Sequence, residues 1–212
     1  MPFSRRRYWI MTILMLGMTA VVSGEESKMR DPSTYLTPEN LKKVEAGEMA
    51  TLFDRNKEGG KSAGQGIVIG LINKPMDAVW KVLLDVNAHP EYMPRVVKTE
   101  VYDTGTEEIG VKETLKILYK SVSYHVLQRN DETTHKSTWR LDPGKKNDIA
   151  DTYGYWALFP HGDTQTIAVY AVHVDSGLPV PQIVEDFLGR QDLPGVVRAV
   201  KNRTESDGKY KK

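Results

Sequence analysis

Alternating apolar and polar residues predict that most of this chain forms strands. After residue 94, segments with the two-residue period of a pleated strand follow one another and are separated by short polar turns. The predicted strands span residues 95–103, 109–119, 121–129, 135–141, 149–159 and 164–174. Because short turns connect neighbouring strands in antiparallel order, we expect an antiparallel sheet with one solvated face.

The stretch of residues 66–94 combines a strand, a helix and a turn. The β-branched run of residues 67–72 predicts a strand, and Asn73 is positioned to cap a helix that has Pro75 in its first turn. One apolar stripe at helical spacing follows, formed by Met76, Val79, Trp80, Leu83 and Leu84. Pro90 and Pro94 then end the helix.

Further helices are predicted on either side of the strand-rich region. Thr37 followed by Pro38 indicates a helix over residues 37–46, before a strand over 49–55. Near the other end, one helix would follow Pro179 and Pro181, and Asp192 would cap another that has Pro194 in its first turn. The first of these carries Ile183, Val184, Phe187 and Leu188 on one face. The charged residues from 205 onwards are expected to fray.

Several of these motifs resemble the START-like helix-grip superfamily, particularly its polyketide-cyclase and coenzyme Q-binding branch. The matching residues are Pro75, Val79, Trp80, Leu83, Asp85, the Pro90–Pro94 turn, Gly154-Tyr155-Trp156 and the proline-rich entry to the last helices. The resemblance implies an α+β helix-grip fold, in which a curved antiparallel sheet wraps around a C-terminal helix and encloses a cavity.

The first 24 residues have the pattern of a secretory signal peptide. Three arginines, Arg5 to Arg7, precede an apolar core over residues 8–22 that is shorter than the roughly 20 residues of a comfortable membrane span. Small residues at 22–24 then offer a cleavage site. We therefore expect a periplasmic or secreted protein, exported by the Sec or the twin-arginine route, with an uncleaved membrane anchor as the alternative.

The expected organisation has four parts. Residues 1–24 form the signal peptide, residues 25–63 an N-terminal extension that begins as a loose linker, residues 64–204 the helix-grip domain, and residues 205–212 a charged tail.

Composition excludes several classes of function. The formal charge of +1 becomes −2 without Arg5, Arg6 and Arg7, so no strongly basic surface for nucleic acid is expected. The chain has no cysteine, which excludes disulfides and thiolate chemistry. Its five histidines show no metal-binding spacing, and no G-x-S-x-G motif is present. We expect no metal, no cofactor and no nucleic-acid partner.

The resemblance implies a cavity that holds a lipid, quinone, polyketide or other apolar ligand. The residues expected to line it are Glu113, Leu115, Ile117, Tyr124, Trp139, Trp156, Tyr170 and Phe187. The alternative is that the large aromatic side chains fill a solid core.

Glu113 is the residue in this set that most needs an explanation. Alternation along its strand places it inward with Val111, Leu115, Ile117 and Tyr119. A buried carboxylate costs several kcal/mol unless it is paired, so it should pair with another side chain or with a ligand. Arg140 and His125 are the candidate partners in the chain. The alternative is a position near the rim of the cavity, or a shifted strand register.

These observations favour a non-catalytic carrier that binds a hydrophobic small molecule, acts as a monomer and makes transient contact with a membrane. The alternative is a cyclase or aromatase of the same fold, with Glu113, Tyr124, His125 and Tyr170 as candidates for proton transfer. Expected export counts against that reading. A third possibility is an interaction module like the toxin-like branch of the superfamily said to act on ribosomes. Export and the absence of a basic surface count against it.

Overall fold

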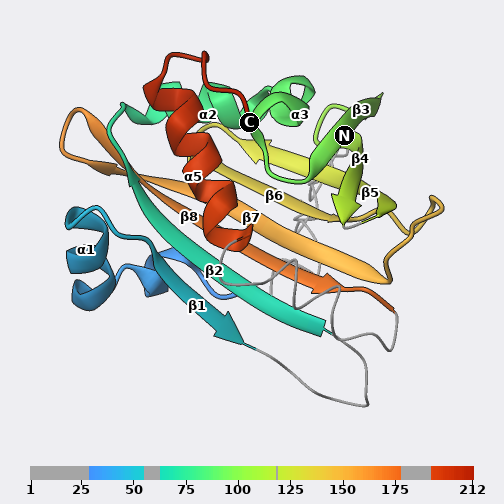
Figure 1. Cartoon of the computed structure of the whole chain (residues 1–212), viewed down its shortest axis with the longest axis horizontal. Helices are drawn as coiled ribbons and strands as arrows, with labels where there is room; N and C mark the ends of the chain where they lie inside the picture. The colour runs from blue at the N-terminus through green and yellow to red at the C-terminus, as the bar shows by residue number, and fades with distance from the viewer. Residues whose placement is uncertain (1–28, 55–62, 118, 178–191) are drawn as a thin grey trace, which may run out of the picture.

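Eight antiparallel strands form one curved, open sheet in the computed structural model, which describes residues 29–54, 63–117, 119–177 and 192–212 (Figure 1). The strands are β1 (Ala50–Asp54), β2 (Ala63–Ile72), β3 (Val96–Thr104), β4 (Ile109–Ile117), β5 (Lys120–Asp131), β6 (Lys136–Leu141), β7 (Asp151–His161) and β8 (Gln165–Asp175). Their order in the sheet is β1-β2-β8-β7-β6-β5-β4-β3. The predicted antiparallel sheet is therefore confirmed, and the strands from β3 onwards agree with the predicted ones to within two residues at each end.

The helices lie on both faces of this sheet. They are η2 (Pro32–Tyr35), α1 (Pro38–Glu45), α2 (Met76–Leu84), η3 (Val86–Ala88), α3 (His89–Tyr92) and α5 (Asp192–Glu205). Helix α5 crosses the concave face, and α2 and α3 lie at one end of it (Figure 1). This is the helix-grip fold that the sequence predicted.

Helix α5 packs directly on β2. Its residues Leu193, Val197 and Val200 are buried against the concave face. A Cβ atom at Gly70 of β2 would lie only 2.8 Å from a methyl group of Val197, so the glycine is what permits this close approach. The ammonium group of Lys201 also donates a hydrogen bond of 2.8 Å to the carbonyl of Leu71.

The N-terminal extension covers the opposite, convex face. Val44 of α1 packs with Ile67 and Ile69 of β2 and with Val169 of β8, all of them buried. Strand β8 is therefore buried on both faces. Strand β1 pairs with β2, so the described part of the extension belongs to the same packed sheet. Asp31, predicted to lie in a loose linker, caps η2.

Three helix caps were predicted: that of α1 is confirmed, that of α2 is wrong, and Asp192 is the first residue of α5, where its carboxylate accepts a hydrogen bond from Arg95. The Thr37 hydroxyl accepts the backbone N–H of Asn40 at 3.3 Å and caps α1 as expected. Helix α2 instead has Pro75 at its N-cap position, without a side-chain cap. The Asn73 side chain accepts a hydrogen bond from Gln165 at 2.7 Å, because strand β8 lies next to it in the fold.

The C-terminal tail is ordered by contacts with the rest of the molecule, which corrects the prediction that it frays. The Lys212 ammonium group donates hydrogen bonds to the carbonyls of Met93 and Val96. Arg203 joins the tail to α3, through the carbonyl of Tyr210 and the carboxylate of Glu91. These long-range partners could not be read from a charged segment alone.

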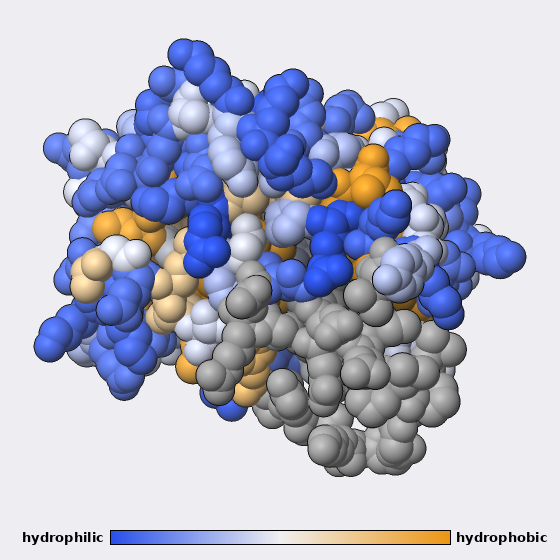
Figure 2. All heavy atoms as spheres, viewed as in Figure 1, coloured by the Kyte–Doolittle hydropathy of each residue, from blue (hydrophilic) through white to orange (hydrophobic). Residues whose placement is uncertain are grey.

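Three predicted features lie outside the described residues: the signal peptide, the helix that carries Phe187, and residue 118 at the end of a predicted strand. Within the described ranges, no helix is both long enough and apolar enough to cross a membrane. The face seen in Figure 2 is mostly hydrophilic, with apolar residues in separate patches.

Trp80 gives a direct test of how the helices at the end of the sheet are packed. It is 6% exposed within the main core, and its Nε1 is a buried side-chain atom without a hydrogen-bond partner among the described residues. We expect Trp80→Ala to lower the free energy of unfolding by about 3–5 kcal/mol, because it opens a cavity. Trp80→Phe should cost clearly less, since it also removes the unpaired N–H.

Urea unfolding followed by circular dichroism measures both changes. A Trp80→Ala variant with wild-type stability would contradict the placement of this side chain in the core.

Candidate ligand cavity

A cavity of about 130 Å³ lies between the concave face of the sheet and the helices. The predicted cavity residues that line it are Glu113, Leu115, Ile117, Tyr124, Trp139, Trp156 and Tyr170. They come from five strands, β4 to β8, and the fold brings them together as the sequence predicted. Phe187, the remaining candidate, lies outside the described residues.

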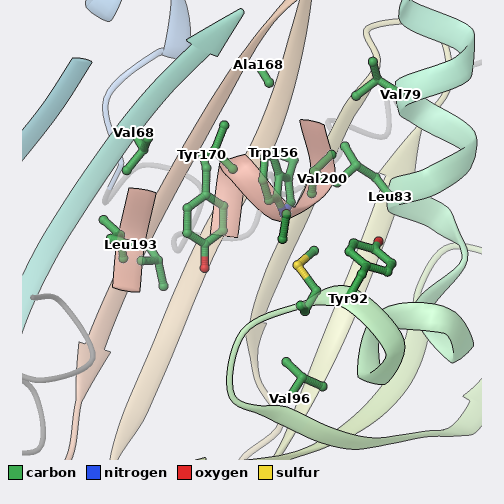
Figure 3. Packing of buried hydrophobic residues seen from close by; sticks show 14 of the residues in the cluster. Val68, Val79, Leu83, Tyr92, Val96, Trp156, Ala168, Tyr170, Leu193 and Val200 are labelled. Atoms are coloured by element: carbon green, nitrogen blue, oxygen red, sulfur yellow. The ribbon is translucent and has the colours of Figure 1, made fainter. Parts of the chain in front are cut away.

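Three aromatic rings form one wall of the cavity. Trp139 of β6 stacks on Tyr170 of β8 with ring centroids 5.7 Å apart, and Trp156 of β7, the strand between them, has its ring centroid 4.5 Å from that of Tyr170. Tyr170 and Trp156 lie side by side and face the turn that carries Tyr92 (Figure 3). A Cβ atom at Gly154 would lie only 2.4 Å from the Trp139 ring, so the absence of a side chain at this position makes room for the indole.

Glu113 faces the cavity and is paired with Tyr124. The two residues are direct partners across β4 and β5, and the Tyr124 hydroxyl donates a hydrogen bond of 2.7 Å to Oε2 of Glu113. The inward orientation predicted from alternation is therefore confirmed. Tyr119 does not share this orientation: it lies beyond the end of β4 and is 98% exposed.

Neither predicted partner of Glu113 reaches it. Arg140 lies on the outer face of β6 and forms an ion pair of 2.9 Å with Glu108. His125 pairs in register with Lys112, on the outer side, where its backbone N–H donates to the Asn147 side chain. His125 therefore also drops out of the set proposed for proton transfer.

The tyrosines beside Glu113 are held in their neutral form. Burial, strengthened by the Glu113 charge and its hydrogen bond, raises the pKa of Tyr124 well above its usual value of 10.0. Burial and the same charge also raise the pKa of Tyr170. At neutral pH, both hydroxyls are therefore protonated, and that of Tyr124 donates its proton to Glu113 in a hydrogen bond.

His89 is a cavity residue that the sequence did not single out. Its Nε2 lies 3.1 Å from the Leu83 carbonyl, which can only accept, so this nitrogen carries the proton. Burial lowers the pKa of His89, although the nearby Glu113 charge acts in the opposite direction. A histidine in a proline-rich turn gave no signal of this position, because its side-chain direction depends on tertiary packing.

The cavity lining also includes polar side chains that sequence analysis missed. These are Gln128, Ser137, Thr152 and Ser176. Gln128 shares the strand face of Tyr124 and Val126, so extending the two-residue alternation along β5 would have found it. Its amide donates hydrogen bonds to Asn130 and Ser137. The cavity is thus mainly apolar with a few polar groups, as is usual for small-molecule sites.

A second cavity, of about 260 Å³, lies on the convex face. Its described lining includes Arg30, Arg129 and Lys136 together with Asp31 and Glu108. Charges of both signs make it a poor site for an apolar molecule. Among the residues that the structure describes, no group of three or more acidic or histidine side chains could hold a metal ion.

The burial of His89 predicts a pH-dependent stability. Because its pKa is lower in the folded than in the unfolded protein, the unfolded chain binds the proton first as pH falls. Stability should therefore decrease as pH drops below about 6.5, the usual histidine value. His89→Gln should lose less stability over this range.

Chemical unfolding at a series of pH values from about 7.5 to about 5, on either side of the usual histidine pKa, checks this. His125→Gln, which removes a ring on the outer face, controls for the substitution itself. A pH dependence of His89→Gln identical to that of the wild type would contradict the assignment.

Comparison with known proteins supports the fold. Solved structures similar to this chain include an aromatase/cyclase from Streptomyces sp. R1128 (16% identity, TM-score 0.57, covering 74% of this chain and 94% of that one). Others are a STAR-related lipid transfer protein from Xanthomonas axonopodis (19% identity, TM-score 0.57, 74% and 93% covered) and a protein from Thermus thermophilus (15% identity, TM-score 0.60, 68% and 98% covered). At such identities, these likenesses show the fold alone.

The sequence comparisons address the family. A search of curated protein sequences gave no match. The profile of the family described as "Polyketide cyclase / dehydrase and lipid transport" matches residues 72–201, which is more than half of the chain. The chain belongs to this family, within the START-like helix-grip superfamily.

Proposed function

We propose that this protein binds a hydrophobic small molecule in the cavity between β4–β8 and the helices, and carries it without chemical change. The observation that carries the proposal is the cavity lining: apolar and aromatic side chains enclose a space in which only a few polar groups converge. The Xanthomonas axonopodis neighbour, a lipid transfer protein by its description, agrees with this class of ligand.

A cyclase or aromatase is the second candidate. It is favoured by the Tyr124–Glu113 pair, which joins a hydroxyl donor and a carboxylate inside the cavity, and by the aromatase/cyclase among the similar structures. Turnover of a poly-β-keto substrate that is lost in both Glu113→Gln and Tyr124→Phe would support the enzyme. Release of an unaltered ligand from the purified protein would support the carrier.

We propose further that the mature protein acts as a monomer outside the cytoplasm and touches a membrane transiently. The arginine-led apolar segment at the start of the sequence supports export. The fully exposed Tyr119 lies close in sequence to Lys116 and Lys120, which are also exposed. An aromatic ring with flanking lysines suits the interface of an anionic bilayer.

Filling the cavity should abolish binding without unfolding the protein. Val122 lines the cavity and is half-buried, so Val122→Phe should displace a ligand. Val97→Phe adds the same volume on the exposed face of β3 and is the matched control. Native mass spectrometry of protein purified from its own host should detect a bound apolar molecule in the wild type and in Val97→Phe, but at least about tenfold less in Val122→Phe.

An equal ligand load in both variants would contradict the proposed cavity. Circular dichroism shows whether each variant is folded.

Export should produce a mature chain that starts near Glu25. Replacing Arg5 and Arg6 by lysine should leave Sec-dependent export intact, whereas it should stop twin-arginine export. N-terminal sequencing and cell fractionation measure both outcomes. Exported protein that still begins at Met1 would contradict cleavage.

A further inference from the structure

The described residues that line the cavity include an acidic side chain but no strongly basic one. Its described lining residues include four side chains that can titrate: His89, Glu113, Tyr124 and Tyr170. No lysine or arginine is among the described lining residues, so none of them supplies a positive charge there.

Glu113 keeps one oxygen available to a ligand. Its Oε2 accepts the Tyr124 hydroxyl at 2.7 Å. Within the described residues, the buried side-chain polar atom that lacks a partner is Nε1 of Trp80, so Oε1 of Glu113 is not sealed inside the protein without a partner. Because Glu113 lines the cavity, this oxygen can accept a hydrogen bond from a molecule that enters.

His89 does not neutralise Glu113. Its Nε2–H is already donated to the Leu83 carbonyl at 3.1 Å. Burial lowers the pKa of the ring, which is therefore uncharged at neutral pH. Tyr124 and Tyr170, both held neutral, can donate hydrogen bonds but cannot balance a charge.

We infer that the cavity selects neutral apolar alcohols and phenols and rejects anionic amphiphiles such as carboxylates of the same size. A ligand hydroxyl would donate a hydrogen bond to Glu113, whose carboxylate already accepts one from the neutral Tyr124 hydroxyl. A ligand carboxylate would bring a second negative charge beside it in a poorly solvated space, where like charges repel strongly. This inference rests on the proposed function, since it concerns the ligand of the same cavity.

Three probes with one ring skeleton separate the effects: 2-naphthol, 2-naphthoate and naphthalene. Isothermal titration calorimetry at neutral pH should give tightest binding for 2-naphthol, intermediate binding for naphthalene, and at least about tenfold weaker binding for 2-naphthoate than for 2-naphthol. In Glu113→Gln the difference between 2-naphthol and 2-naphthoate should shrink, because the repelling charge is gone.

Glu100→Gln is the matched control. It removes one carboxylate from the neighbouring strand β3, where the side chain pairs with Lys98 and Lys112 on the outer face. It should leave the preference unchanged.

The possible results have distinct meanings. Equal affinities for 2-naphthol and 2-naphthoate, or a preference for the carboxylate, would overturn the inference while leaving an apolar binding site. A preference that survives in Glu113→Gln would show that Glu113 is not its cause. If none of the three probes binds to the wild-type protein, the inference fails, whereas the proposed function is decided separately by the ligand load in native mass spectrometry.

Discussion

The contact between α5 and β2 is the constraint on which the rest of the structure depends. A curved sheet leaves an apolar concave face that must be covered, and α5 covers it by lying against the backbone of β2 at Gly70. Val197 fills the space that a side chain at position 70 would take, and Lys201 fixes the helix further along through the Leu71 carbonyl. The cavity lies beside this contact, between the helices and strands β4 to β8.

Some side chains belong both to the hydrophobic core and to the wall of the cavity. Trp156 and Tyr170 belong to the buried core, yet each turns one side to the cavity. Trp139 reaches the same wall because Gly154 provides space under its ring. The alternative of a solid aromatic core therefore holds in part: the rings pack against one another, and the cavity lies where their packing stops. Glu113 is tolerated at this boundary because Tyr124 satisfies one of its oxygens and the other is not sealed in the protein.

The sequence predicted the fold and the inward face of β4, but not the pairings across strands. Alternation within one strand identified Glu113 as inward, since that property is local. Its partner depends on the register of β4 with β5, in which Glu113 lies opposite Tyr124 and His125 opposite Lys112. Two residues, 118 and 119, separate these strands, and knowing that length in advance would have given the pairing. His89 and the Lys212 contacts carry no local signal at all, because each depends on segments distant in the sequence.

The convex face of the sheet is covered by other elements over one half and less covered over the other, and this difference affects how the cavity can accept a ligand. On the convex face, α1 and the N-terminal segment cover β2, β8 and β7, and these strands also carry buried core residues on the concave face. Strands β4 and β5 present half-buried or exposed residues such as Lys112, Lys116 and Ser123 on that face. Fewer buried contacts mean a lower local free energy of opening. We therefore expect the wall that carries Glu113 and Tyr124 to adjust to a ligand, while the aromatic wall on β7 and β8 remains fixed.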